Sequence, residues 1–157
     1  MRNYKINHHR PLFLSAIAWL AMDFATKYYA AHADVNSIVF IQNFFYLTLH
    51  GNKGVAFGVF LGHVFQIIVS IIILALLVTF GFRHLLRQKR NSFLNQILLG
   101  IIIGGALGNL INRIYLGYVI DFIVLRPFPV FNLADIGITV GLLILFFINY
   151  GTENKKS

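Results

Sequence analysis

The sequence lacks cysteine entirely and holds only five acidic residues among 157. Without cysteine, disulfide bonds and thiolate chemistry are excluded. Charged residues of both signs are scarce as well: they form 11% of the chain, whereas a soluble domain carries about 25%. Hydrophobic residues form 58%. This composition, at a length that suits one domain, predicts a single integral membrane domain over residues 1–157.

Several kinds of functional site are also missing from the sequence pattern. The six histidines are scattered without the spacing of metal ligands, so no metal site is expected. The chain has no glycine-rich phosphate-binding loop, and no serine or lysine is placed as a nucleophile beside a base. Chemistry at this chain is therefore expected to need neither a metal nor another cofactor.

Four apolar stretches are long enough to cross a hydrocarbon core, which needs about 20 residues. They cover residues 11–32, 58–82, 93–115 and 132–150. Helices are expected, because each backbone polar group in lipid must find its partner within the segment. Residues 36–57 break the pattern and favour short strands outside the membrane, ending in a turn at Gly51–Gly54. The predicted fold is an all-α four-helix membrane bundle with a small extracytoplasmic β portion.

The net charge of +8 could indicate a nucleic-acid partner, but the distribution of the charge argues against one. Basic residues precede the first stretch, fill the connection after the second and follow the fourth. The other two connections hold only Lys53 and Arg126. An excess of Lys and Arg marks the cytoplasmic loops of membrane proteins. The pattern predicts a multi-pass protein with both termini in the cytoplasm, whose basic clusters also contact membrane lipid.

Polar residues gather toward one end of this predicted bundle. Spans one and three end outside the membrane and span four begins there, which brings polar positions of all three toward the outer surface. The residues are Asp23, Lys27, Asn52, Asn109, Arg113, Asp121, Asn132 and Asp135. A charged side chain near the bilayer centre costs about 2.5–3.5 kcal/mol. The gathering therefore indicates a functional site at the extracytoplasmic face.

Structural alternatives exist for most of these residues. Asp23 and Lys27 are four positions apart and could form an ion pair that orients the first helix. Asn132 could cap the fourth helix, with Asp135 at its third position favoured by the helix dipole. Asp121 could be a solvated residue at a strand-like or loop position.

Two further features of the third span have alternatives of the same kind. Asn109 and Arg113 could bind lipid phosphate or extend toward the membrane interface. Gly100, Gly104 and Gly108 recur every four residues and form a small-residue face, which favours close packing against another helix.

Asp121 and Asp135 could perform a reaction together if the fold brings them close. Two adjacent carboxyl groups cannot both ionise easily, so they share one proton, and one acts as base while the other acts as acid. Such a pair can activate water for attack on a peptide bond, as in the aspartic proteases. The dipole at the start of the fourth helix favours the ionised form of Asp135. We therefore expect Asp121 to hold the shared proton in the resting state.

Five short blocks carry a resemblance to a known family. They are MDFATK (22–27), NKGVAFG (52–58), GGALGNLINR (104–113), GYVIDF (117–122) and FPVFNLADIGI (128–138). In this order and on four spans, they resemble the bacterial lipoprotein signal peptidases, also called signal peptidase II. Each block alone is a weak signal, whereas the ordered set is specific and covers nearly the whole chain.

The resemblance implies an intramembrane aspartic endopeptidase of the bacterial inner membrane. It would remove the signal peptide of prolipoproteins before a diacylglyceryl-modified cysteine, act as a monomer and bind the cyclic peptide globomycin. By their positions in the motifs, Asp121 and Asp135 would be the catalytic pair. The other matched positions would hold the substrate or support the site: Asn52, Gly54, Asn109, Arg113, Asn132, Asp23 and Lys27.

One position departs from the family pattern. The third block commonly ends in an aspartate before its arginine, and here this residue is Asn112. The change removes a negative charge beside Arg113. We therefore expect Arg113 to be anchored differently, with an effect on substrate affinity or pH dependence rather than on the reaction itself.

Two other functions fit parts of the sequence. A proton-coupled transporter would use membrane carboxylates as relays, but it predicts inverted repeats and polar groups near the midplane. No repeat is visible, and the acidic residues lie toward one surface. A non-catalytic assembly factor would bind a partner through the glycine face and the outer segment. It predicts that replacing Asp121 or Asp135 abolishes no peptide cleavage.

Overall fold

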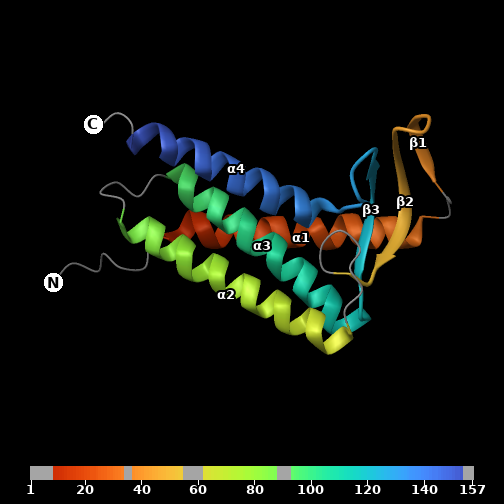
Figure 1. The fold of residues 1–157 in the computed structure, drawn as a ribbon, viewed down its shortest axis with the longest axis horizontal. Helices are drawn as coiled ribbons and strands as arrows, with labels where there is room; N and C mark the ends of the chain where they lie inside the picture. The colour runs from red at the N-terminus through yellow and green to blue at the C-terminus, as the bar shows by residue number, and fades with distance from the viewer. Residues whose placement is uncertain (1–8, 34–36, 55–61, 88–92, 154–157) are drawn as a thin grey trace.

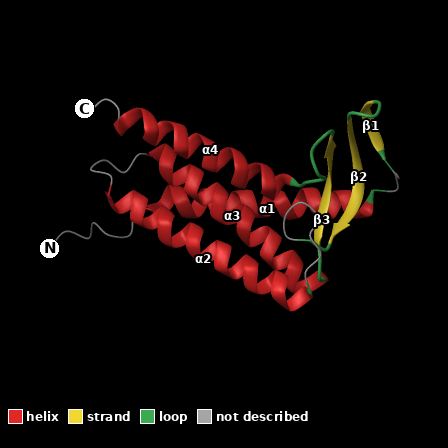
Figure 2. Ribbon diagram, viewed as in Figure 1, coloured by secondary structure: helices red, strands yellow, loops and turns green. Residues whose placement is uncertain are grey.

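The computed structural model of the chain describes residues 9–33, 37–54, 62–87 and 93–153. In these residues it contains the helices α1 (Arg10–His32), α2 (His63–Arg87), α3 (Phe93–Leu116) and α4 (Leu133–Glu153), and the strands β1 (Ile38–Ile41), β2 (Phe45–Asn52) and β3 (Val119–Leu125). The helices lie side by side, and the strands form a small sheet at one end of the bundle (Figure 1). Figure 2 shows the strands gathered at one end of the bundle, where the last part of α1 extends beside them.

Helix α3 is the centre of the bundle and packs against α1, α2 and α4. The glycine face predicted for it lies against α1: a Cβ on Gly100 or Gly104 would meet the α1 backbone, and one on Gly108 would meet the Asp23 carboxylate. Close helix packing is therefore confirmed as the role of this face. It brings an α1 carboxylate into direct contact with the α3 surface.

The antiparallel sheet has the strand order β1-β2-β3. Its first two strands confirm the β-rich segment, and Asn43 takes the positive φ of 58° that their connection requires. The turn predicted at Gly51–Gly54 is wrong at its start, because Gly51 belongs to β2 and pairs with Ile120. Residues 55–57 of that predicted segment lie outside the described residues.

Strand β3 follows α3 directly. Gly117, with φ of 79°, ends α3, and its N–H bonds the Arg113 carbonyl at 3.1 Å. A left-handed glycine after the last helical residue is a common helix C-cap. The chain then runs antiparallel to β2, so Asp121 pairs with His50 in the sheet. The alternative in which Asp121 is only a solvated residue is wrong, since this residue lies in a strand and is 1% exposed.

The four predicted spans correspond to the four helices with shifted boundaries. α2 begins at His63, not at residue 58, and extends through Arg87, so Arg83 and Arg87 belong to the helix and not to a connection. Residues 58–61 lie outside the described part of the chain.

Two helices of the described residues, α2 over His63–Arg83 and α3, are long and apolar enough to cross a membrane. The described apolar part of α4, Leu133–Ile148, is shorter. α1 is not among these candidates, because Asp23 and Lys27 lower its mean hydropathy.

Each helix has one end near the sheet and the other at the opposite end of the bundle. α1 begins and α4 ends at the end of the bundle away from the sheet, and the second end of α2 lies there too (Figure 1). The C-terminal ends of α1 and α3 and the start of α4 lie toward the sheet. Every helix end that carries a predicted site residue is therefore at the same end of the molecule.

Candidate active site

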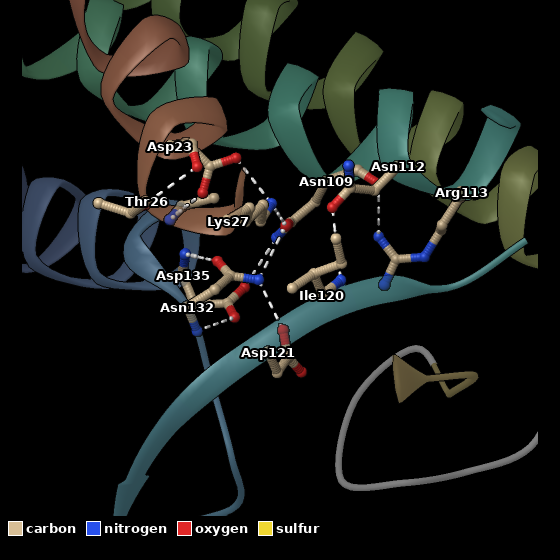
Figure 3. Close-up of polar contacts among 11 residues, drawn as sticks. Asp23, Thr26, Lys27, Asn109, Asn112, Arg113, Ile120, Asp121, Asn132 and Asp135 are labelled. Carbon is tan, nitrogen blue, oxygen red and sulfur yellow. Dashed lines mark hydrogen bonds and ion pairs between the residues drawn. The ribbon is translucent and has the colours of Figure 1, made fainter. Parts of the chain in front are cut away.

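Asp121 projects from β3 into the space between the sheet and the helices (Figure 3). Its Oδ2 accepts a hydrogen bond of 2.8 Å from Asn52 Nδ2, and its Oδ1 accepts one of 2.6 Å from Asn132 Nδ2. Two amide donors therefore hold one carboxylate, and they come from β2 and from the residue before α4. The sheet and the helix bundle meet at this side chain.

Asp135 lies in the first turn of α4, where Asn132 caps the helix. Asn132 Oδ1 accepts from Asp135 N at 3.0 Å, and Asp135 Oδ2 accepts from Asn132 N at 3.2 Å. This reciprocal arrangement satisfies two backbone donors at the helix start. The capping alternative is confirmed, but it does not exhaust the role of Asn132, because its side-chain nitrogen bonds Asp121. One residue thus connects both carboxylates.

The second oxygen of Asp135 is held from α3. Asn109 Nδ2 donates to Asp135 Oδ1 at 2.8 Å, and Asn109 Oδ1 accepts from Asn132 Nδ2 at 3.1 Å. The two asparagine amides therefore form a bridge from α3 to the start of α4. An amide with donors and an acceptor pointing in fixed directions is a rigid support for two carboxylates.

Asp23 and Lys27 form the ion pair that their spacing predicts, with 2.6 Å between Lys27 Nζ and Asp23 Oδ2. The pair is completely enclosed, at 0% and 1% exposure. It is not self-contained, however: Asp23 Oδ1 accepts from Ala134 N at 3.0 Å, and Lys27 Nζ donates to Asn109 Oδ1 at 2.9 Å. The pair therefore ties α1 to both α4 and α3.

Arg113 is 7% exposed and lies inside the protein. The alternative in which Asn109 and Arg113 extend to the membrane interface is therefore wrong. The two terminal nitrogens of Arg113 lie 3.4 Å from the carbonyl oxygens of Asn109 and Gly54. Its buried Nε has no hydrogen-bond partner in the described part of the chain. Gly54 in turn donates its N–H to Asn52 Oδ1 at 2.8 Å, which fixes the end of β2 over the site.

Both aspartates line one cavity of about 490 Å³. Asn52, Asn109 and Arg113 line its polar side. The apolar side is formed by β3, the segment that follows it and the first turns of α4: Val119, Leu125, Phe128, Pro129, Val130, Phe131, Ile136 and Val140. A mainly apolar cavity with a few convergent polar groups is typical of a binding or active site.

Burial raises the pKa of Asp121 from its ordinary value of 3.8 to about 6. The amide donors of Asn52 and Asn132 favour the ionised form and oppose this rise, while the negative charge of Asp135 adds to it. A carboxyl group with this pKa can hold or release a proton near neutral pH, as acid–base catalysis requires.

All nine residues predicted for the site are brought together, and three others join them. Asn112 Oδ1 accepts from the backbone N–H of Ile120 at 3.4 Å, one residue before Asp121. The expected effect of this departure on Arg113 stays a prediction; the contact that Asn112 makes is with the β3 backbone, where an Asp could accept as well.

The other two additions come from α2. His63 Nε2 lies 2.7 Å from the Arg113 carbonyl, and the Gln66 side chain donates to the Lys53 carbonyl at 2.6 Å. Gln66 is a buried polar residue in an apolar span. A polar residue in such a span indicates a functional or packing role, so the sequence could have drawn attention to Gln66. His63 offers no such signal, because histidine at the end of a span is ordinary.

Comparison with known proteins decides the family. A family model described as signal peptidase (SPase) II, peptidase family A8, matches residues 15–150. The chain belongs to the signal peptidase II family. It is thus an aspartic peptidase, and the transporter and assembly-factor alternatives lose their support.

Individual members of the signal peptidase II family agree with this result. A lipoprotein signal peptidase of Moorella thermoacetica is 40% identical over 138 residues, covering 86% of this chain and 89% of that protein. One from Staphylococcus aureus strain JH9 is 36% identical, covering 91% and 90%. A solved structure described as a bacterial membrane enzyme has a TM-score of 0.78 at 31% identity, covering 98% of this chain and 94% of the other.

Proposed function

We propose that Asp121 and Asp135 are the catalytic pair with which this peptidase removes the signal peptide of prolipoproteins. The observation that carries the proposal is that Asn132 bonds both carboxylates, with 2.6 Å to Asp121 Oδ1 and 3.2 Å to Asp135 Oδ2, at the wall of one cavity. The proposal requires that one water molecule in this cavity contacts both carboxylates.

The reaction follows from the protonation of this pair. We assign the shared proton to Asp121, whose pKa burial raises to about 6, and the role of base to Asp135. Asp135 takes a proton from water as the water oxygen bonds the peptide carbon, while Asp121 protonates the carbonyl oxygen. The resulting diol then collapses: the C–N bond breaks, the amine takes the proton from Asp135, and a hydroxyl proton returns to Asp121. All atoms balance, and both aspartates regain their resting states.

Arg113 is placed to hold the substrate backbone. Its side chain lines the cavity, and within the described residues its terminal nitrogens make only long contacts, at 3.4 Å, with the carbonyl oxygens of Asn109 and Gly54, so they retain donors that a peptide carbonyl can satisfy. A buried donor without a partner costs about 1–3 kcal/mol. Binding a carbonyl group would recover part of this cost, so the enzyme gains affinity where the scissile segment must be aligned.

The apolar side of the cavity suits an apolar substrate. The walls formed by Phe128, Val130, Ile136 and Val140 can cover the apolar signal peptide and the acyl chains of a diacylglyceryl-modified cysteine. A cyclic peptide inhibitor such as globomycin would occupy the same cavity.

We further propose four membrane spans in the bacterial inner membrane, with both termini in the cytoplasm and the site at the extracytoplasmic face. α1 begins and α4 ends at the same end of the bundle, opposite the sheet (Figure 1). The cysteine-free chain allows a direct test by single cysteine substitution. An impermeant maleimide should label Gln42→Cys in intact spheroplasts and Lys156→Cys only after permeabilisation; the reverse pattern would refute the orientation.

Separate substitutions test the catalytic pair. Asp121→Asn and Asp135→Asn should each abolish processing of a diacylglyceryl-modified precursor, followed by gel shift, while the variant still accumulates in the membrane. Asp34→Asn serves as the matched control for loss of an aspartate elsewhere in the chain. Processing near the parental rate by either site variant would exclude that aspartate from the reaction.

A further inference from the structure

Lys27 is a buried cation that can donate hydrogen bonds but cannot accept them. An ammonium group has three donors and no acceptor. Lys27 Nζ lies 2.6 Å from Asp23 Oδ2 and 2.9 Å from the side-chain amide of Asn109. The atom of that amide nearest to Lys27 must therefore be the oxygen. The amide nitrogen in this place would face the cation with its own N–H groups.

This contact decides what Asn109 presents to Asp135. An amide carries oxygen on one side and NH2 on the other, so holding Oδ1 toward Lys27 turns Nδ2 toward Asp135 Oδ1, at 2.8 Å (Figure 3). Asn132 Nδ2 supports the same orientation by donating to Asn109 Oδ1 at 3.1 Å. In the opposite orientation an amide oxygen would face the Asp135 carboxylate, which is tolerable only when Asp135 carries a proton.

We propose that Lys27 is a positioning residue of the peptidase reaction, acting through the amide of Asn109 to keep an N–H donor on Asp135. With this donor in place Asp135 stays ionised as the base, and the shared proton stays on Asp121. The inference rests on the proposed catalytic pair. Lys27 is connected to Asp135 through two hydrogen bonds, one to Asn109 and one from Asn109, and through them it helps to determine which aspartate holds the proton.

Asp23 has a separate task that the test must preserve. Its Oδ2 balances the charge of Lys27, and its Oδ1 accepts from Ala134 N at 3.0 Å, which fixes the first turn of α4. Removing Lys27 alone would leave Asp23 as an uncompensated buried charge, and breaking a buried ion pair in this way is strongly destabilising. Asp23→Asn combined with Lys27→Met removes both charges together, and the new amide oxygen can still accept from Ala134.

The decisive experiment compares this paired substitution in two backgrounds. With Asn109 present, Asp23→Asn/Lys27→Met should lower kcat by about 10- to 100-fold, because a hydrogen bond to a charged group loses its fixed orientation. In an Asn109→Ala background the same pair should change kcat by less than about threefold, since the residue through which Lys27 acts is gone. Rates are normalised to folded enzyme in the membrane. Equal losses in both backgrounds would overturn the proposal.

Asn109→Asp provides an independent test if the paired variant does not accumulate. Lys27 would hold one carboxylate oxygen and turn the other toward Asp135, so the donor is missing until residue 109 is protonated. Activity should be low at pH 7 and rise as the pH falls, unlike that of the parent. The charged and titratable groups around this position are Asp23 and Lys27 of α1, His63 of α2, Arg113 of α3, Asp121 of β3 and Asp135 of α4.

The outcomes of this second test are also decisive. Parental activity at pH 7, or inactivity at every pH from 4 to 8, would mean that residue 109 presents no donor to Asp135, and the proposal fails. Failure of the proposed function looks different: Asp121→Asn or Asp135→Asn would then process the precursor. If those two variants are inactive while the two backgrounds respond equally to loss of the ion pair, only the role of Lys27 is refuted.

Discussion

Asn132→Ser separates the two roles of the residue that connects both aspartates. Serine and asparagine are comparably good helix N-caps, so the cap on Asp135 N and the stability of α4 should change by only a few tenths of a kcal/mol. The serine hydroxyl is too short to replace the Nδ2 donor, which lies 2.6 Å from Asp121 Oδ1. The other amide donor to Asp121, Asn52 Nδ2, bonds the opposite carboxylate oxygen, Oδ2.

The size of the effect follows from the lost hydrogen bond. A hydrogen bond to a charged group contributes about 1.5–3 kcal/mol. Because about 1.4 kcal/mol corresponds to a factor of ten in rate, kcat/KM should fall about 10- to 150-fold. Asn132→Ala removes the cap as well, so it should lower activity similarly and also cost about 1 kcal/mol of stability.

The assay needs activity and stability from the same preparation. Purified variants in detergent are followed by precursor cleavage under single-turnover conditions and by thermal unfolding. The result expected for Asn132→Ser is a melting temperature close to that of the parent with strongly reduced cleavage. If Asn132→Ser cleaves at the parental rate, the amide donor to Asp121 contributes nothing, and Asn132 is only a helix cap.

Three other predictions concern single contacts. Asn52→Ala removes a donor that favours ionised Asp121, so the pKa of Asp121 should rise above about 6. The pair of aspartates then keeps its proton to higher pH, and the alkaline limb of the pH–rate profile should move to higher pH. A shift to lower pH, or no shift, would contradict this prediction. Gly108→Ala should destabilise the protein by about 1–3 kcal/mol in thermal unfolding, because its Cβ meets the Asp23 carboxylate; Gly62→Ala, whose Cβ meets nothing within 4 Å, is the control. Asn112→Asp should leave KM unchanged, since residue 112 contacts the Ile120 N–H; a lower KM would indicate that it contacts the substrate.

The helices and the composition of the site could be predicted from sequence for a physical reason. Long apolar stretches have few alternatives to a helix in lipid, and polar residues near such stretches are costly enough to stand out. Asp23 and Lys27 show this well: their spacing predicts the ion pair, which forms at 2.6 Å. The helix cap at Asn132 likewise depends only on residues three positions apart.

The contacts between distant elements could not be predicted in this way. VIDFIVL reads as an apolar run beside a membrane, and it becomes β3 only because β2, about 70 residues earlier, pairs with it. The bond from Asp23 to Ala134 N depends on how close α1 approaches the start of α4. That distance is set by α3 glycines between them, which hydropathy does not reveal.

The buried ion pair deserves an explanation beyond stability. Enclosing Asp23 and Lys27 in an apolar bundle costs several kcal/mol per ion before their attraction is counted, and apolar residues of similar size would often be no less stable. What apolar residues could not do is orient an amide. Each partner of the pair makes one further hydrogen bond to a group next to Asp135: Asp23 accepts from Ala134 N, and Lys27 donates to Asn109 Oδ1. The network therefore lowers the stability of the fold somewhat, and in return it holds the donors around the two carboxylates in a single arrangement. An Asp23→Leu/Lys27→Met protein that unfolds at a higher temperature than the parent, yet cleaves its precursor more slowly, would be the direct signature of that exchange.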